Sequence, residues 1–161
     1  MKQKFLLIIV FSLLAATAFS QTGEARKIFE FGNVNCEEYL AAVDVMIGQT
    51  NNLNSKIYVF VYEGKERRPV YKNGEFVNYK SVLPQFGLVK ARIKSMKKRL
   101  TYRKSPLENY VFVNGGFRKD FGVEIWLIPN GVEPPKPTLT LEKMKYRRGK
   151  PSGFCLDCCG L

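Results

Sequence analysis

The apolar residues of this chain gather in short runs that predict strands. Residues 56–62 read KIYVFVY, and every side chain after Lys56 is β-branched or aromatic, the composition that strands favour. Because this run does not alternate with polar residues, it predicts a strand covered on both faces. Weaker runs at 26–31, 110–113 and 123–128 predict further strands. We expect residues 56–62 to form the central strand.

Two other segments carry apolar residues at helical spacing, and each predicts an amphipathic helix. The stripe of the first helix is Cys36, Leu40, Val43 and Ile47. Asn35, with Glu38 three residues later, predicts a capping box at its start. The second helix is expected to begin at Pro84, because proline suits the first helical turn. Its stripe is Phe86, Val89, Ile93, Met96 and Leu100.

Turn and proline signals complete the predicted organisation. Asn73-Gly74, flanked by strand-forming residues, predicts a small β-hairpin inserted at about 65–80. Beyond Gly131 the chain becomes rich in proline, which a sheet does not accommodate, so a linker and a basic tail occupy 132–161. The expected fold class is α+β. The order β-α-β-α-β-β would form a two-layer sandwich over 21–131, with two helices on a mixed four-stranded sheet, the hairpin insertion and an extended C-terminal tail.

The N-terminus predicts export. Lys2 and Lys4 precede the apolar run 5–14, and small residues at Ala18 and Ser20 are typical of a signal-peptidase site. We expect residues 1–20 to be a signal peptide cleaved after Ser20. The apolar run is short for a membrane span, so the mature chain is expected to be periplasmic or secreted, with no transmembrane segment.

The charge balance favours an anionic partner. The chain carries a formal net charge of +12, and such an excess attracts polymers or surfaces of negative charge. Basic residues cover the outer faces of the second helix, among them Lys90, Lys94, Lys97 and Lys98. An anion-binding face and a merely solvated basic face both fit this pattern. Export and the lack of a DNA-binding motif argue against a nucleic-acid partner.

The sequence offers no constellation typical of an enzyme. It contains no histidine, which excludes histidine-based triads and the commonest general base, and no phosphate-binding fingerprint is present. We therefore expect a protein that is not an enzyme, with no cofactor and no metal site.

The four cysteines are expected to form disulfides, because export leads to an oxidising compartment. The candidates are Cys36, Cys155, Cys158 and Cys159. We expect Cys36 to pair with one of the three tail cysteines, although the connectivity stays open. A thiol-disulfide or zinc-binding role of the tail is a further alternative, because Cys155 and Cys158 have the spacing of a redox pair or half a zinc knuckle.

Residues of the second helix carry a family resemblance. Leu88, Arg92, Ser95, Met96 and Leu100 match a pattern of the OmpA-like domain of bacterial envelopes, and the likeness covers about residues 27–129. The whole chain also resembles short exported bacterial proteins. The OmpA-like resemblance implies a peptidoglycan-binding module in which the arginine holds the carboxylate of diaminopimelate.

The second half of the family's ligand site is different here. Family members place an aspartate in a Gly-His-Thr-Asp turn after the second strand, whereas this chain reads Tyr62-Glu63-Gly64-Lys65-Glu66. Glu63 and Glu66 are the candidate substitutes for that aspartate. The resemblance thus implies an exported, non-catalytic module that binds an anionic envelope component, with Arg92, the helix lysines and Glu63 as ligand-binding residues. The alternative is a basic secreted protein that contacts polyanions or a protein through the hairpin and the basic helix.

Overall fold

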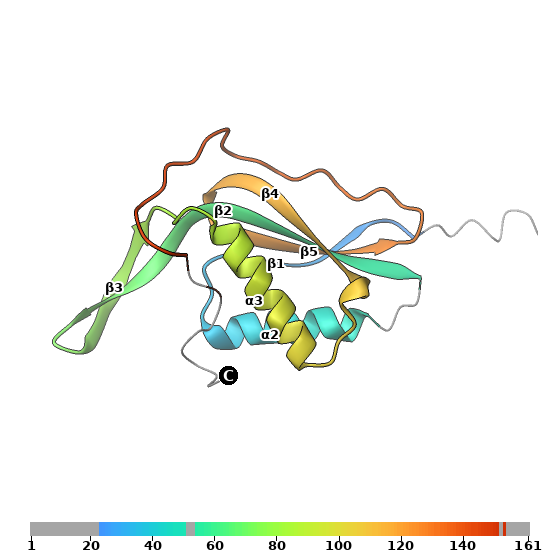
Figure 1. Cartoon of the computed structure of the whole chain (residues 1–161), viewed down its shortest axis with the longest axis horizontal. Helices are drawn as coiled ribbons and strands as arrows, with labels where there is room; N and C mark the ends of the chain where they lie inside the picture. Colours follow the sequence, from blue (N-terminus) through green and yellow to red (C-terminus); the bar gives the residue numbers. More distant parts are fainter. Residues whose placement is uncertain (1–22, 51–53, 152, 154–161) are drawn as a thin grey trace, which may run out of the picture.

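A curled sheet with both helices on one face forms the body of the protein, in a computed structural model that describes residues 23–50, 54–151 and 153 (Figure 1). The elements in chain order are β1 (Arg26–Phe31), α2 (Cys36–Gln49), β2 (Ser55–Lys72), β3 (Glu75–Val82), α3 (Leu88–Tyr102), the 3-10 turn η1 (Leu107–Asn109), β4 (Tyr110–Asp120) and β5 (Gly122–Pro129). Over these residues the fold is α+β, with two helices and a mostly antiparallel sheet of five strands.

Strand β2 organises the sheet. Its first half pairs in parallel with β4, where Ile57 lies opposite Tyr110, and antiparallel with β5, where Val59 lies opposite Ile125. β1 extends the sheet beyond β5. The run 56–62 therefore lies between two neighbouring strands, as expected for the central strand.

The core lies between the helices and one face of the sheet. Alternate side chains of β2 and β5, including Val59 and Ile125, point into it and are almost fully buried. The opposite-facing side chains of the same strands, including Tyr62 and Glu124, lie on the face away from the helices. Both faces of the central strands are thus covered, one by helices and the other by the C-terminal segment described below.

The predicted hairpin is present, but it is not a separate insertion. β2 continues without a break to Lys72 and pairs with β3, so residues 66–82 form a two-stranded arm that projects from the body (Figure 1). Asn73 and Gly74 both have positive φ, as the turn signal predicts. Gly64 lies within this continuous strand, against the backbone at Asp120 and Phe121. A glycine there permits a close approach of two backbones.

Both helices differ in detail from the prediction. The buried face of α2 is Tyr39, Ala42, Val43 and Met46. The predicted stripe, by contrast, included Leu40 and Ile47, which are only partly buried. Asn35 and Glu38 do form the capping box. α3 begins at Leu88 rather than at Pro84, because Gly87 adopts a left-handed conformation at the N-cap. Phe86 therefore lies outside the helix and is 77% exposed.

The segment after β5 returns across the face opposite the helices and then reaches α3 (Figure 1). Backbone N–H groups of Thr140 and Leu141 both donate to the carbonyl of Phe117, and the N–H of Arg147 donates to Pro84 O. We call residues 132–151 and 153 the strap. Among the described residues, no helix is long and apolar enough to cross a membrane. The predicted signal peptide lies outside the described residues.

Candidate functional site

Arg92, the main predicted ligand-binding residue, lies in the middle of α3 with its side chain only 14% exposed. Its Nη2 is 2.8 Å from Glu66 Oε1, and its Nη1 donates to the carbonyl oxygen of Gly153 at 2.8 Å. The guanidinium also lies 5.3 Å from the ring centroid of Phe121. Burial lowers the pKa of Arg92, and the charge of Glu66 opposes that effect. Arg92 is therefore a paired, largely buried cation.

Glu66 joins two arginines from different parts of the chain. Its side chain is 5% exposed, and its second oxygen, Oε2, lies 3.3 Å from Arg147 Nη2. Arg147 also donates from Nε to Leu83 O at 2.8 Å. This Arg92–Glu66–Arg147 triad links α3, β2 and the strap. Of the two candidate substitutes for the family's aspartate, Glu66 is the one that lies beside Arg92.

Glu63 makes a different contact. The hydroxyl of Tyr146 donates to Glu63 Oε2 at 2.6 Å, and Glu63 is 7% exposed. Burial, then the hydrogen bond to Glu63 and the negative charge of that carboxylate, raise the pKa of Tyr146 to about 12. The predicted ligand-binding role of Glu63 stays a prediction, since the contact described here is one between β2 and the strap.

A cleft of about 540 Å³ opens between the arm and the start of α2. Residues 32–35 and Glu38 line one wall, and the arm supplies the other through Arg67, Pro69, Tyr71 and Tyr79. Arg92 and Phe121 complete the lining. We call this the arm cleft. It combines two guanidinium groups, a carboxylate, amide side chains and aromatic rings, which are the groups needed to bind a polar ligand with ionised substituents.

Asn33 fixes the geometry of the arm cleft. Its Nδ2 donates to Lys65 O at 3.1 Å, and its Oδ1 accepts from the backbone N–H of Arg67 at 3.0 Å. One amide side chain thus ties the loop after β1 to the base of the arm. No local sequence pattern indicates this contact, because Asn33 is 32 residues or more from both of its partners.

The predicted lysines of α3 do not line the arm cleft in the described part of the chain. Lys90, Lys94, Lys97 and Lys98 are exposed on α3, and Lys97 Nζ lies 5.3 Å from the ring centroid of Phe112. The structure therefore separates Arg92, which reaches the arm cleft, from the basic outer face of the helix.

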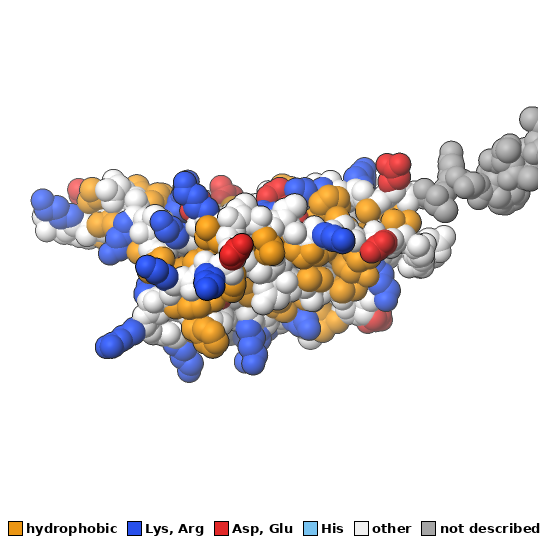
Figure 2. Space-filling view, turned by 90° about the horizontal axis from the view of Figure 1, so that it is seen from above, with side chains coloured by type: hydrophobic (Ala, Val, Ile, Leu, Met, Phe, Trp, Pro, Cys, Tyr) orange, Lys and Arg blue, Asp and Glu red, His pale blue; other side chains and the backbone are white. Residues whose placement is uncertain are grey.

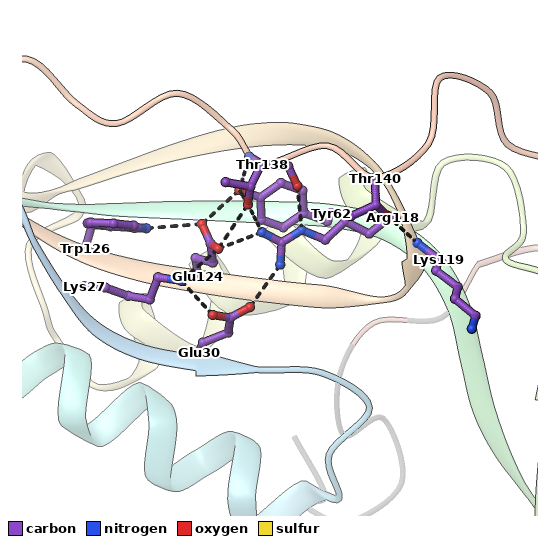
Figure 3. Close-up of polar contacts among 9 residues, drawn as sticks. All are labelled: Lys27, Glu30, Tyr62, Arg118, Lys119, Glu124, Trp126, Thr138 and Thr140. Carbon is purple, nitrogen blue, oxygen red and sulfur yellow. Dashed lines mark hydrogen bonds and ion pairs between the residues drawn. The ribbon is translucent and has the colours of Figure 1, made fainter.

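A second polar cluster lies on the opposite face of the sheet (Figure 3). Glu124 is 4% exposed and accepts hydrogen bonds from Arg118, Lys27 and Tyr62 at 2.6, 3.0 and 2.9 Å. Burial alone would raise the pKa of Glu124, but these hydrogen bonds, that from Arg118 first, lower it to about 2. A glutamate inside the apolar strand 123–128 is the sequence signal that could have indicated a buried ionic site.

This cluster fastens the strap to the sheet. Thr138 donates from its backbone N–H to the hydroxyl of Tyr62 at 3.2 Å, and its hydroxyl donates to Glu124 at 3.3 Å. Arg118 Nε donates to Thr138 O at 2.9 Å, and its guanidinium lies 3.5 Å from the ring centroid of Tyr62. Figure 3 shows two further members of the cluster: Glu30 pairs with Lys27 and Arg118, and Trp126 Nε1 donates to Glu124 Oε2 at 3.3 Å. We therefore interpret the cluster as structural.

Cys36, at the first position of α2, is disulfide-bonded. The predicted partners Cys155, Cys158 and Cys159 lie outside the described residues, so their pairing stays a prediction. Within residues 23–50, 54–151 and 153, no group of three or more acidic, histidine or cysteine side chains could hold a metal ion.

Comparison with known proteins identifies no relative of this chain. No protein-family model matches the chain, and no curated protein or solved structure matches it significantly.

Proposed function

We propose that this protein is an exported, non-catalytic binding module for an anionic cell-envelope component, with peptidoglycan as the candidate ligand. The observation that carries the proposal is the arm cleft, which contains Arg92, with Glu66 bound to the same guanidinium, and the exposed Arg67. A positive site next to a buried acid is the arrangement that the OmpA-like resemblance implies. The excess of basic residues, +12 over the whole chain, would increase the rate of encounter with an anionic polymer.

The order of the elements supports the same proposal. When β3 is set aside as part of the arm, the chain runs β1, α2, β2, α3, β4, β5, which is the β-α-β-α-β-β order of the OmpA-like domain. The sheet order β1-β5-β2, with β4 parallel to β2, places α3 beside the middle of the sheet. A two-layer OmpA-like core with an added arm and strap is the fold we propose.

The two arginines would have different tasks. Arg92 is engaged by Glu66 and by the Gly153 carbonyl, so it would act mainly through its charge. Arg67 is exposed at the base of the arm, where its guanidinium can form a bidentate contact with a ligand carboxylate. We propose that Arg67 makes the direct contact and that Arg92 contributes positive potential within the cleft.

The test is cosedimentation of residues 21–161 with peptidoglycan sacculi at low and high salt. Arg67→Glu removes the proposed contact, and Lys98→Glu is its control, because it makes the same charge change on an exposed position of α3. We expect the unaltered protein and Lys98→Glu to remain bound at high salt and Arg67→Glu to be released. Equal release of all three proteins at high salt would contradict the proposal.

That contrary result would favour a second function, nonspecific binding of polyanions by the basic surface. The observation in its favour is the exposure of Lys90, Lys94, Lys97 and Lys98 on α3, and Figure 2 shows Lys and Arg side chains over much of the visible surface. Binding of this kind depends on counterion release and falls steeply with salt. Arg67→Glu and Lys98→Glu would then weaken binding equally, because each changes the net charge by the same amount.

A further inference from the structure

The arm exposes large apolar side chains that have no place in the core. Tyr71 is 62% exposed, Phe76 52% and Tyr79 61%. The arm projects from the body (Figure 1), and its tip consists of the polar residues 72–75. The apolar surface is therefore a side of the arm and not its end.

A bulge in the arm brings these rings onto one side. Tyr71 lies opposite Phe76 and Pro69 lies opposite Tyr79, whereas the register shifts next to Tyr71 and leaves Val77 without a partner. Without that shift, Phe76 and Tyr79 would point to opposite faces of β3. The ring centroids of Tyr71 and Phe76 are 6.2 Å apart, and those of Phe76 and Tyr79 are 5.0 Å apart. We call these three residues the aromatic row.

The aromatic row is continuous with the arm cleft. Tyr71 and Tyr79 line the cleft together with Arg67. An extended ligand that enters the cleft can therefore lie along the row and still reach a guanidinium group.

We propose that the aromatic row binds the sugar rings of a glycan strand whose carboxylate-bearing substituents occupy the arm cleft. The faces of tyrosine and phenylalanine rings are apolar with negative potential, and they attract the C–H-rich faces of sugars, while tyrosine hydroxyls can bind sugar hydroxyls. This inference rests on the function proposed above and adds the saccharide part of the ligand.

Charge and shape favour this occupant over others. The polar tip at residues 72–75 opposes insertion of the arm into a bilayer, which would place its end among acyl chains. Glu38 lines the cleft and Glu37, also exposed, is its neighbour in sequence, so a polyphosphate chain would meet negative charge there. A glycan carries neutral hydroxyl and amide groups between its carboxylates, which suits a cleft containing amides and charges of both signs.

The test separates the saccharide from the peptide part of the ligand. Binding would be measured for three probes: glycan strands freed of peptide, the free stem peptide, and an oligodeoxythymidine of similar length. The variants are Tyr71→Ala and Tyr79→Ala, with Tyr102→Ala as control, because Tyr102 is a similarly exposed tyrosine (57%) at the end of α3. Circular dichroism would verify that each variant is folded.

We expect each arm variant to lower affinity for the glycan strand about fivefold, the loss typical of one aromatic contact, with no effect on the stem peptide and none from Tyr102→Ala. If sacculi are bound in an Arg67-dependent way but the arm variants bind glycan normally, this inference fails and the proposed function stands. If sacculi are not bound at all, both fail. Tighter binding of the oligodeoxythymidine than of the glycan would overturn this inference and favour nucleic acid as the ligand.

Discussion

Glu66 on β2 and Arg92 on α3, 26 residues apart, form a buried ion pair with a 2.8 Å separation between Oε1 and Nη2. The same carboxylate also binds Arg147 of the strap. The acid that pairs with Arg92 thus lies at the base of the arm. The ion pair holds this base against α3. The ligand site we propose and the attachment of the strap share this carboxylate.

The first prediction concerns the removal of this shared charge. Glu66→Gln would leave the guanidinium groups of Arg92 and Arg147 without their carboxylate, and Arg92 is largely buried. We expect the free energy of unfolding in urea to fall by about 3 kcal/mol, as when one partner of a buried ion pair is removed. The control is Glu75→Gln at the exposed arm tip, which should change stability by less than about 0.5 kcal/mol. Equal stability of the two variants would show that the triad contributes little.

A second prediction follows from Tyr146. Its pKa is raised from 10.0 to about 12 by burial and by Glu63, so the folded state holds the phenol proton more tightly than the unfolded state does. This contribution to stability is complete below pH 10 and is lost as the pH rises from 10 towards 12. We expect Tyr146→Phe to flatten the fall of unfolding free energy over this range. Phe is the suitable substitution because it keeps the ring packed against Phe86, at 5.4 Å between centroids.

The absorbance of tyrosinate would check the same assignment. The unaltered protein should contain two groups that titrate near pH 12, Tyr39 and Tyr146, and Tyr146→Phe should retain only the one that belongs to Tyr39. A titration curve unchanged by the substitution would contradict the assignment.

The apolar pattern of the chain was sufficient to predict the main strands and helices of the body, but not the connections between them. Burial leaves a local sequence pattern that depends on the element. A strand buried on both faces gives an apolar run such as 56–62, and a helix buried on one face gives a stripe such as those of α2 and α3. The predicted start of α3 at Pro84 was wrong because the left-handed Gly87 sets the N-cap, and Gln85, two residues before it, pairs with Arg147 of the strap. A contact between segments so far apart in sequence leaves no local trace.

The candidate site was predictable only in part, for the same reason. The OmpA-like pattern predicted Arg92 as a site residue. It left two nearby acids, Glu63 and Glu66, as candidates for the partner of that arginine. Arg67 and the aromatic row were not predicted as site residues, because their shared location depends on the bulge and on the clamp made by Asn33. Alternation along β3 would have assigned Phe76 and Tyr79 to opposite faces.

A third prediction tests why β2 continues through Gly64. A Cβ at this position would overlap the backbone of Asp120 and Phe121, where Phe121 N–H donates to Lys65 O at 3.0 Å. Gly64→Ala should therefore lower the free energy of unfolding by about 3 kcal/mol, as overpacking against a backbone does. Gly48→Ala is the control, because nothing lies within 4 Å of its added Cβ. In helix α2 it should stabilise the protein by about 0.5–1 kcal/mol. Equal effects of the two substitutions would mean that the two backbones can separate at Gly64.

The fourth prediction concerns acid stability and Glu124. Its pKa falls from 4.5 to about 2, since hydrogen bonds from Arg118 and Lys27 outweigh the effect of burial. The stabilisation by this carboxylate is therefore complete above pH 4.5 and is lost as the pH falls towards 2. We expect it to contribute about 3 kcal/mol at neutral pH. Glu124→Gln should remove this contribution and make the unfolding free energy less dependent on pH in that range.

Limited proteolysis would connect this carboxylate to the strap. Because Glu124 and Thr138 share hydrogen bonds, Glu124→Gln should speed cleavage within 132–141 at pH 7, and the unaltered protein should show the same increase when the pH is lowered below 3. Glu30→Gln is the matched control, since Glu30 also binds Lys27 and Arg118 but its side chain is 46% exposed. Comparable cleavage of both variants would indicate that the strap is held by its backbone hydrogen bonds rather than by the buried charge.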